Sequence, residues 1–199
     1  MVEGILTYAG LASGNKLEQT AIDLARFIGE IVKSLEETAH REGAQIIAEV
    51  PSDLGVVKTY PMALRLIVEN LIVNAIRHGL PDNRDDFDGL VPINIRIREG
   101  GDKKLLVTVE DSGEGISKDD MKRIFEPFVR GKRAKEQQHP GSGLGLHLVK
   151  RVLTMLNGRI SVDSPYIDTY GALQPGCRFT CEIPHSIAEA TEEHGTGGT

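Results

Sequence analysis

Asp111-Ser112-Gly113-Glu114-Gly115-Ile116 is the stretch that decides the fold, because it directly follows the apolar run Leu105–Val109. A short apolar run rich in β-branched residues predicts a buried strand. A carboxylate at a strand end can accept a hydrogen bond from an exocyclic amine, and Gly113 and Gly115 let the backbone approach a flat ring closely. Aspartate and glycine also favour ordinary turns. The flanking segments must therefore decide between a ligand site and a turn.

Downstream, Gly141-Ser142-Gly143-Leu144-Gly145-Leu146 opens a helix predicted over Leu144–Leu156. Glycine-rich backbone at a helix start offers unpaired N–H groups and the positive end of the helix dipole, which suits phosphate. The segment lacks the Gly-Lys-Ser/Thr of a P-loop, and no βαβ unit surrounds it as in a dinucleotide fold. The preceding stretch, Val129–Pro140, is polar and basic without periodicity, so we expect a mobile loop that could close over phosphates.

Upstream, a helix is predicted over Pro61–His78, with Pro61 in its first turn and Gly79 beyond its end. Its apolar residues form one side. Asn70, Asn74, Arg77 and His78 share another stripe. An amide oxygen suits Mg²⁺, Arg77 would face phosphate, and His78 could pack against ribose or base. The alternative is a solvated polar face.

The remaining pattern predicts an α+β fold. The chain alternates helices with strands, the latter at 45–50, 56–58, 91–99, 104–110, 159–163 and 178–183, with a helix from Asp23 to about Arg41 and a short one at 118–124. We expect a two-layer α/β sandwich, in which a mixed, mostly antiparallel sheet is covered on one face by about three helices. The connection Ser164–Gly176 is long and irregular.

Composition narrows the function classes. The chain has 199 residues and a net charge of −6, which gives no reason to expect a nucleic-acid surface. No apolar run is long enough to span a bilayer, and we expect no membrane contact from this chain and a cytoplasmic location. Cys177 and Cys181 would lie on the same face of one strand, so we expect reduced, buried thiols rather than a disulfide.

Four segments in order carry a resemblance to a known family: Glu69–Ala75, Asp111–Ile116, Phe125–Phe128 and Gly141–Leu146. They resemble the N, G1, F and G2 boxes of the ATP-binding catalytic domain of sensor histidine kinases. That family belongs to the Bergerat ATP-binding group, shared with gyrase and Hsp90. The resemblance covers nearly all of the chain from Leu24 to Pro184.

The resemblance implies ATP and Mg²⁺ as cofactors. Asn74 would bind Mg²⁺ through its side-chain oxygen, with Asn70 beside the phosphates, Arg77 on phosphate and His78 against the nucleotide. Asp111 would accept the adenine amine, with Gly113, Gly115 and Ile116 bordering the base.

Later segments complete the implied site. Phe125 and Phe128 would pack to anchor the lid, and Arg130 would reach the γ-phosphate. The phosphates would be wrapped by Gly141, Ser142, Gly143, Leu144, Gly145 and Leu146. The implied catalytic residues are Asn70, Arg77 and Arg130.

The position of Asn70 favours phosphotransfer over hydrolysis. In hydrolysing members of the group, a glutamate there acts as general base on water, and asparagine cannot take a proton. Glu69 is adjacent, but about 100° round the helix, so it should face elsewhere. The γ-phosphate would then pass to a histidine. None of the six histidines of the chain fits the acceptor motif of the family, so we expect the acceptor on a separate dimerisation domain.

The expected organisation has three parts: residues 1–19 as the end of a dimerisation helix and its linker, 20–185 as the ATP-binding domain, and 186–199 as a disordered tail. Expected partners are ATP or ADP, the dimerisation-histidine domain and a response regulator, and no nucleic acid. The alternatives are a serine kinase of the anti-sigma-factor type, a nucleotide-dependent interaction module without turnover, and a true ATPase. The long connection Ser164–Gly176 is either a partner surface or merely a loop.

Overall fold

The computed structural model describes residues 18–81, 89–129 and 142–187, and its centre is a five-stranded sheet with the order β2-β4-β5-β9-β6. β2 and β4 pair in parallel, and the other neighbours pair antiparallel. The strands are β2 (Ala44–Glu49), β4 (Val91–Gly100), β5 (Lys104–Glu110), β9 (Arg178–Pro184) and β6 (Arg159–Asp163). The sheet is mixed and mostly antiparallel, as the sequence predicts.

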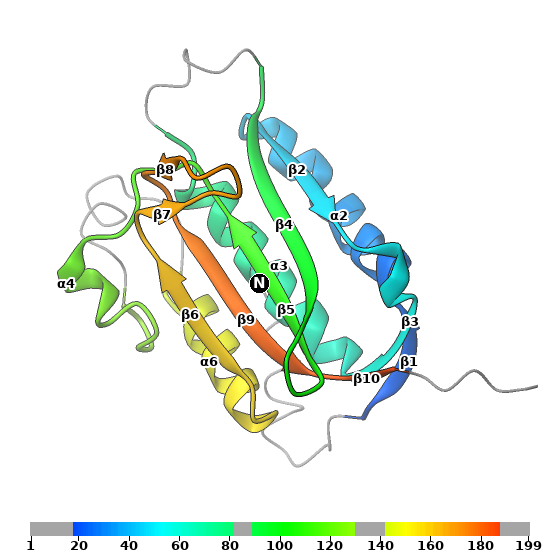
Figure 1. Cartoon of the computed structure of the whole chain (residues 1–199). Helices are drawn as coiled ribbons and strands as arrows, with labels where there is room; N and C mark the ends of the chain where they lie inside the picture. The colour runs from blue at the N-terminus through cyan, green and yellow to red at the C-terminus, as the bar shows by residue number, and fades with distance from the viewer. Residues whose placement is uncertain (1–17, 82–88, 130–141, 188–199) are drawn as a thin grey trace, which may run out of the picture.

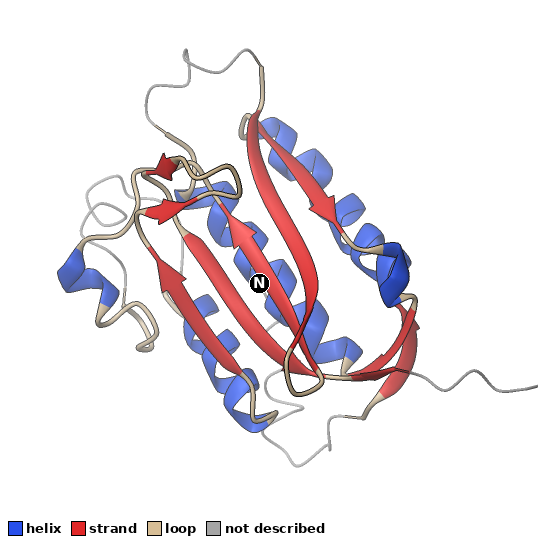
Figure 2. Cartoon of the chain, in the orientation of Figure 1, coloured by secondary structure: helices blue, strands red, loops and turns tan. Residues whose placement is uncertain are grey.

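Three helices cover one face of this sheet: α2 (Leu24–Arg41), α3 (Pro61–His78) and α6 (Gly145–Met155). Figure 1 shows them behind the strands, and Figure 2 shows the same three long helices in blue on that side of the sheet. The side chain of Asp23 accepts from the N–H of Arg26 at 2.9 Å, so it caps α2 as predicted. The predicted two-layer sandwich is confirmed.

The core lies between the sheet and these helices. Side chains of a strand alternate between its two faces. Ile93, Ile95 and Ile97 of β4 are buried against the helices, and so are Leu105, Val107 and Val109 of β5. The intervening residues, such as Asn94 and Arg96, therefore lie on the face of the sheet that no helix covers. Among the described residues, none of the helices has the length and apolar character needed to cross a bilayer.

A second, three-stranded sheet has the order β1-β3-β10. Its strands are β1 (Thr20–Asp23), β3 (Val56–Thr59) and β10 (Ser186–Ile187), both outer strands antiparallel to β3. Only the central strand was predicted. Ser186 and Ile187 lie in this sheet, so the expected tail does not begin at 186. Strands this short carry no readable period and are defined by their pairing with β3. The rest of the predicted tail and nearly all of the predicted linker lie outside the described residues.

The connection Ser164–Gly176 contains a hairpin that the sequence does not predict. β7 (Tyr166–Ile167) pairs antiparallel with β8 (Leu173–Gln174). Asp168 holds the turn: its Oδ1 accepts from the N–H groups of Tyr170 at 2.9 Å and Ala172 at 2.8 Å, and its Oδ2 accepts from Nε2 of Gln174 at 2.7 Å. The short helix α4 (Lys118–Met121) ends before Ile124, where a longer one was predicted. A 3₁₀ turn, η1 (Ser52–Leu54), precedes β3.

Candidate functional site

Asp111 follows β5 and is buried. Its Oδ1 accepts from the backbone N–H groups of Gly113 at 3.1 Å and Cys177 at 3.0 Å. Burial raises the pKa of this carboxyl to about 6, against the lowering effect of the two N–H donors. The group is therefore a carboxylate at neutral pH. Both hydrogen bonds go to Oδ1, which leaves Oδ2 as the oxygen that can accept from a ligand.

Backbone packs against Asp111 so closely that side chains are excluded. A Cβ on Gly113 would lie 2.8 Å from the Cα of Gly79, just past the end of α3. A Cβ on Gly176 would collide with the backbone carbonyl oxygen of Asp111, and one on Gly79 with its side chain. The carboxylate thus occupies a slot whose walls are backbone, as recognition of a flat group requires.

Ser164 joins the turn after Asp111 to the segment before β9. Its Oγ accepts from the N–H of Ile116 at 2.8 Å and donates to the carbonyl of Gly176 at 3.0 Å. Gly115 has φ +79°, and a Cβ there would lie 2.5 Å from the same hydroxyl oxygen. The thiol of Cys177, 3.6 Å from Oγ, is buried, and burial raises its pKa to about 12. Cys181 is also a buried free thiol, so the expectation for both cysteines is confirmed.

Two adjacent residues of α3 face different helices. Nδ2 of Asn70 donates to the carbonyl of Leu66 at 2.8 Å, and its Oδ1 lies 3.0 Å from where a Cβ on Gly145 would stand, so this oxygen faces the start of α6. Glu69 instead accepts from Nη1 of Arg65 at 3.3 Å.

The ion pair between Arg65 and Glu69 lies on the side of α3 that faces α2. The guanidinium carbon of Arg65 lies 5.1 Å from the ring centroid of Phe27 on α2. Glu69 therefore belongs to the side of α3 next to α2, away from Asn70, as predicted. Further along α3, Asn74 and Arg77 are half-buried and His78 is exposed at the end of the helix.

The glycine-rich segment leads into α6, whose N-cap residue Leu144 makes no capping side-chain hydrogen bond. Oγ of Ser142 accepts from the N–H of Leu144 at 3.3 Å, and Gly143 has φ +68°. Leu144 and Leu146 pack against the core, which fixes the start of the helix beside Asn70. The N–H groups of Gly145 and its successors are thus presented at the positive end of the helix dipole.

The two phenylalanines predicted to anchor the lid behave differently. Phe125 packs against the core, with Nζ of Lys150 5.5 Å from its ring centroid. Phe128 is 73% exposed, so the prediction that its ring packs is wrong. Its φ is +61°, and its N–H donates to the carbonyl of Gly143 at 3.0 Å. This left-handed backbone serves the contact with Gly143 and turns the ring outward. Arg130, Gly141 and the predicted lid between them lie outside the described residues.

A charged network next to Asp111 was missed from the sequence. Glu110 is only 3% exposed and pairs with Arg178, Nε to Oε1 at 2.6 Å, and with Nη1 of Arg96. Arg96 also pairs with Glu49 at 3.0 Å. Tyr166 lies under the guanidinium of Arg178, 4.7 Å from ring centroid to carbon. The sequence signal that could have indicated this network is a glutamate, Glu110, at the end of an apolar strand.

Comparison with known proteins identifies this architecture. Residues 59–187 match the family model described as "Histidine kinase-, DNA gyrase B-, and HSP90-like ATPase". The chain belongs to this family. The match includes all four of the segments that carried the resemblance, and it makes the domain one of the ATP-binding ATPase type.

Curated relatives of this family member are sensor kinases. The chain is 29% identical over 187 residues to the alginate biosynthesis sensor protein KinB of Pseudomonas aeruginosa, covering 92% of the chain and 28% of KinB. It is 32% identical over 165 residues to the adaptive-response sensory kinase SasA of a Synechococcus strain, covering 82% of the chain and 41% of SasA. The chain therefore spans less than half the length of these relatives.

Solved structures agree with the fold. Full-length ShkA in complex with AMPPNP superposes with a TM-score of 0.71 at 25% identity, over 95% of this chain and 36% of ShkA. The catalytic domain of the histidine kinase ThkA superposes with a TM-score of 0.64 at 25% identity, over 84% of this chain and 95% of that domain. The predicted fold and kinase resemblance are confirmed.

Proposed function

We propose that this chain is the catalytic domain of a two-component sensor histidine kinase in the cytoplasm. It binds ATP and transfers the γ-phosphate to a histidine on a dimerisation domain. A response regulator then receives the phosphoryl group from that histidine. The observation that carries the proposal is the pair of orientations on α3: Asn70 faces α6, and Glu69 pairs with Arg65 toward α2.

The slot around Asp111 fits adenine. A buried carboxylate with one oxygen held by backbone N–H groups presents the other to an exocyclic amine. Selectivity follows because guanine carries a carbonyl at the equivalent ring position, and two acceptors would then face each other. Gly113, Gly115 and Ile116 supply the rest of this wall.

The start of α6 fits the phosphates. The first turn of α6, the left-handed Gly143 and the half-buried Arg77 supply N–H groups and a positive charge. Asn74, one turn beyond Asn70 on α3, would hold Mg²⁺ through its amide oxygen, and the metal would neutralise phosphate charge when bound. Arg130 would add a cation from the lid.

Asn70 cannot act as a general base, and this favours phosphotransfer over hydrolysis. Water bound beside Asn70 cannot give up its proton to an amide, so hydrolysis is slow and a histidine imidazole is the better nucleophile. We therefore expect the chain to bind nucleotide yet consume little ATP without its acceptor.

The test follows γ-labelled ATP with Mg²⁺ as free phosphate and as protein-bound label. The chain alone should give negligible amounts of both, and addition of a separately prepared dimerisation-histidine domain of the parent protein should give labelled histidine. Steady phosphate release by the chain alone would identify it as an ATPase. Label on an added serine-bearing anti-sigma-type substrate, and not on the histidine domain, would favour the serine kinase. Asn74→Ala should remove the Mg²⁺ dependence of nucleotide binding, and unchanged dependence would move the metal elsewhere.

A further inference from the structure

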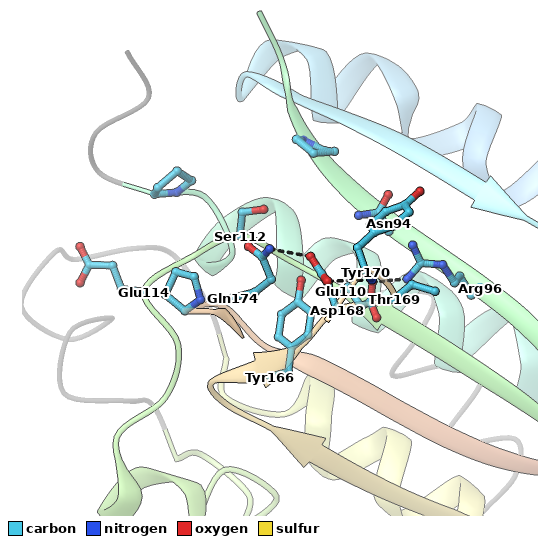
Figure 3. A pocket seen from close by; sticks show the side chains of 13 residues that line it. Asn94, Arg96, Glu110, Ser112, Glu114, Tyr166, Asp168, Thr169, Tyr170 and Gln174 are labelled. Carbon is cyan, nitrogen blue, oxygen red and sulfur yellow. Dashed lines mark hydrogen bonds and ion pairs between the residues drawn. The ribbon is translucent and has the colours of Figure 1, made fainter. Parts of the chain in front are cut away.

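The two ends of the proposed nucleotide site have different surroundings. At the adenine end, Ser112 and Glu114 of the wall Asp111–Gly115 line an open pocket beside the β7–β8 hairpin, as Figure 3 shows. At the phosphate end, the glycine-rich segment packs against the segment Phe125–Val129, and a side chain of α6 reaches that segment as well. This side chain is the imidazole of His147.

His147 is the third residue of α6, and it contacts the backbone of Phe125. Its Nδ1 lies 3.2 Å from the carbonyl oxygen of Phe125, across 22 positions of sequence. A carbonyl oxygen only accepts hydrogen bonds, so Nδ1 must carry the hydrogen and donate it. In a neutral imidazole, the other nitrogen, Nε2, is then unprotonated. The contact therefore fixes the tautomer of the ring as well as its orientation.

Lys150 contacts the side chain of the same phenylalanine. Its Nζ lies 5.5 Å from the ring centroid of Phe125. Residues three apart lie on the same face of a helix, so His147 and Lys150 reach Phe125 from one face of α6. A hydrogen bond weakens steeply when it is bent, whereas a cation above a ring has no such strict requirement. The contact from His147 is therefore the one that places the Phe125 backbone.

The segment Phe125–Val129 in turn supports Gly143, in the glycine-rich segment. The N–H of Phe128 donates to the carbonyl of Gly143 at 3.0 Å. A Cβ on Gly143 would lie 2.9 Å from the carbonyl oxygen of Val129, so the two backbones are in direct contact. The φ of Gly143 is +68°. A shift of Phe125 would therefore reach, within a few residues, the left-handed turn that precedes α6.

The first turn of α6 carries the N–H groups that we propose bind phosphate. The N–H of Leu148 donates to the carbonyl of Leu144, the N-cap residue, at 2.9 Å. The N–H groups of residues 145–147 come before it, so no carbonyl within the helix can accept from them. His147 thus presents its own backbone N–H at this end of the helix, while its side chain bonds to the neighbouring segment.

We propose that His147 is a positioning residue for phosphate binding, which acts through the hydrogen bond from its Nδ1 to the carbonyl of Phe125. This role rests on the proposed nucleotide site. The adenine slot does not depend on the same bond, because Asp111 accepts from the N–H groups of Gly113 and Cys177. Loss of the bond should therefore weaken binding of a phosphorylated ligand and leave binding of an unphosphorylated one unchanged.

The first test determines the tautomer of His147 by ¹⁵N NMR of the histidine-labelled chain, at about pH 8.5, where an ordinary histidine is neutral. The resonances that disappear in His147→Asn identify the ring. We expect a hydrogen on Nδ1 and none on Nε2. A hydrogen on Nε2 instead would overturn the proposal, because Nδ1 could not then donate to Phe125.

The second test compares the affinities of ADP and adenosine by NMR titration. His147→Ala should bind ADP about fivefold more weakly, the effect of losing one ordinary hydrogen bond, and adenosine as the native chain does. His147→Asn should restore the ADP affinity to within about twofold of the native value, because its amide nitrogen takes the place of Nδ1. His147→Gln places its amide nitrogen near the position of Nε2 and should not restore it.

His40 provides a matched control. Its Nδ1 also lies 3.2 Å from a backbone carbonyl, that of Glu36, but both residues are exposed on α2. His40→Ala should leave both affinities unchanged.

Three outcomes would contradict the role of His147. Equal losses of ADP and adenosine affinity in His147→Ala would indicate a general effect on the fold. Equal ADP affinities in His147→Asn and His147→Gln would exclude a bond through Nδ1, and this comparison holds even if the alanine variant does not fold. A native chain that binds neither ADP nor adenosine would contradict the proposed nucleotide site itself, whatever the tautomer of His147.

Discussion

The hydroxyl of Tyr166 donates a hydrogen bond to the backbone carbonyl of Asp111 at 3.2 Å, across 55 positions of sequence. Tyr166 belongs to the β7–β8 hairpin, and Asp111 carries the carboxylate that we propose binds adenine. The pKa of this buried hydroxyl is raised to about 12, by burial first and then by Glu110 and Asp111, so it is a donor throughout the physiological range. The insertion Ser164–Gly176 thus contacts the wall of the slot around Asp111 directly.

Tyr166→Phe should lower the affinity for ADP a few-fold, because it removes the donor that holds the Asp111 carbonyl. The loss corresponds to about 1 kcal/mol, the usual net contribution of one hydrogen bond. Isothermal titration calorimetry measures it. Tyr170→Phe, at the exposed end of the same hairpin, should bind ADP as the native chain does. An unchanged ADP affinity in Tyr166→Phe would mean that the slot is rigid without this contact.

Nucleotide affinity should fall as the pH decreases through about 6. Burial raises the pKa of the Asp111 carboxyl to that value, and the protonated form is a poor acceptor for the adenine amine. The effect on folding has the opposite sign. The folded state holds this proton at a higher pH than the unfolded state, so the contribution of Asp111 to stability falls as the pH rises from about 4 to about 6.

The Asp111→Asn variant distinguishes titration of Asp111 from titration of the phosphates of the nucleotide. The variant should bind ADP at least about tenfold more weakly at neutral pH, since one charge-assisted hydrogen bond is lost. The ratio of its affinity to that of the native chain should rise toward one at low pH. Because phosphate titration is common to both proteins, a ratio that does not depend on pH would contradict the assignment of Asp111.

Glu110→Ala should destabilise the fold by about 3 to 5 kcal/mol, since it leaves Arg178 without its partner and Arg96 with Glu49 alone beneath the hairpin. Urea unfolding followed by circular dichroism measures this change. Glu182→Ala is the matched control, because its ion pair with Lys104 at 2.9 Å is partly exposed and should be worth about 0 to 1 kcal/mol. Equal losses in the two variants would show that burial of Glu110 is not the deciding factor.

Gly176→Ala and Gly29→Ala should change stability in opposite directions. A Cβ at Gly176 collides with the Asp111 carbonyl oxygen, so we expect a loss of about 2 kcal/mol or more together with loss of ADP binding. A Cβ at Gly29, within α2, meets nothing within 4 Å and should stabilise the helix by about 0.5 to 1 kcal/mol. Differential scanning calorimetry compares them. Tolerance of alanine at Gly176 would contradict the close packing of the slot.

The strands of the main sheet and its helices were predictable because each has its own periodic pattern of apolar residues. β4 alternates buried isoleucines with polar residues, and α2 has one apolar stripe. The burial of Glu110 was not predictable, because it depends on the register between strands: Arg178 stands directly opposite it on β9, and Arg96 reaches it from β4. β1 and β10 owe their conformation to β3, and the hairpin to hydrogen bonds of Asp168.

Within the site, residue identities were easier to predict than orientations. Asp111 and the glycine-rich segment could be recognised locally, as could the direction of Glu69 from helix geometry. The exposed ring of Phe128 could not, because it accompanies a left-handed backbone whose N–H donates to Gly143, a contact that local sequence does not reveal. Ser164 is one serine among several in the sequence. Its hydrogen bonds with Ile116 and Gly176, which connect two glycine-containing segments, form only in the folded chain.

The residues of the wall Asp111–Gly115 should differ in how well they tolerate mutation. Asp111 packs against Gly79, and a Cβ would meet backbone at Gly113 and the Ser164 hydroxyl at Gly115, whereas Ser112 and Glu114 line the open pocket beside the β7–β8 hairpin. Substitution at 111, 113 or 115 should therefore weaken nucleotide binding strongly, whereas substitution at 112 or 114 should leave it nearly unchanged. Sequence change at 112 and 114 can thus alter the outer surface of the wall without altering the slot around Asp111 on its inner side.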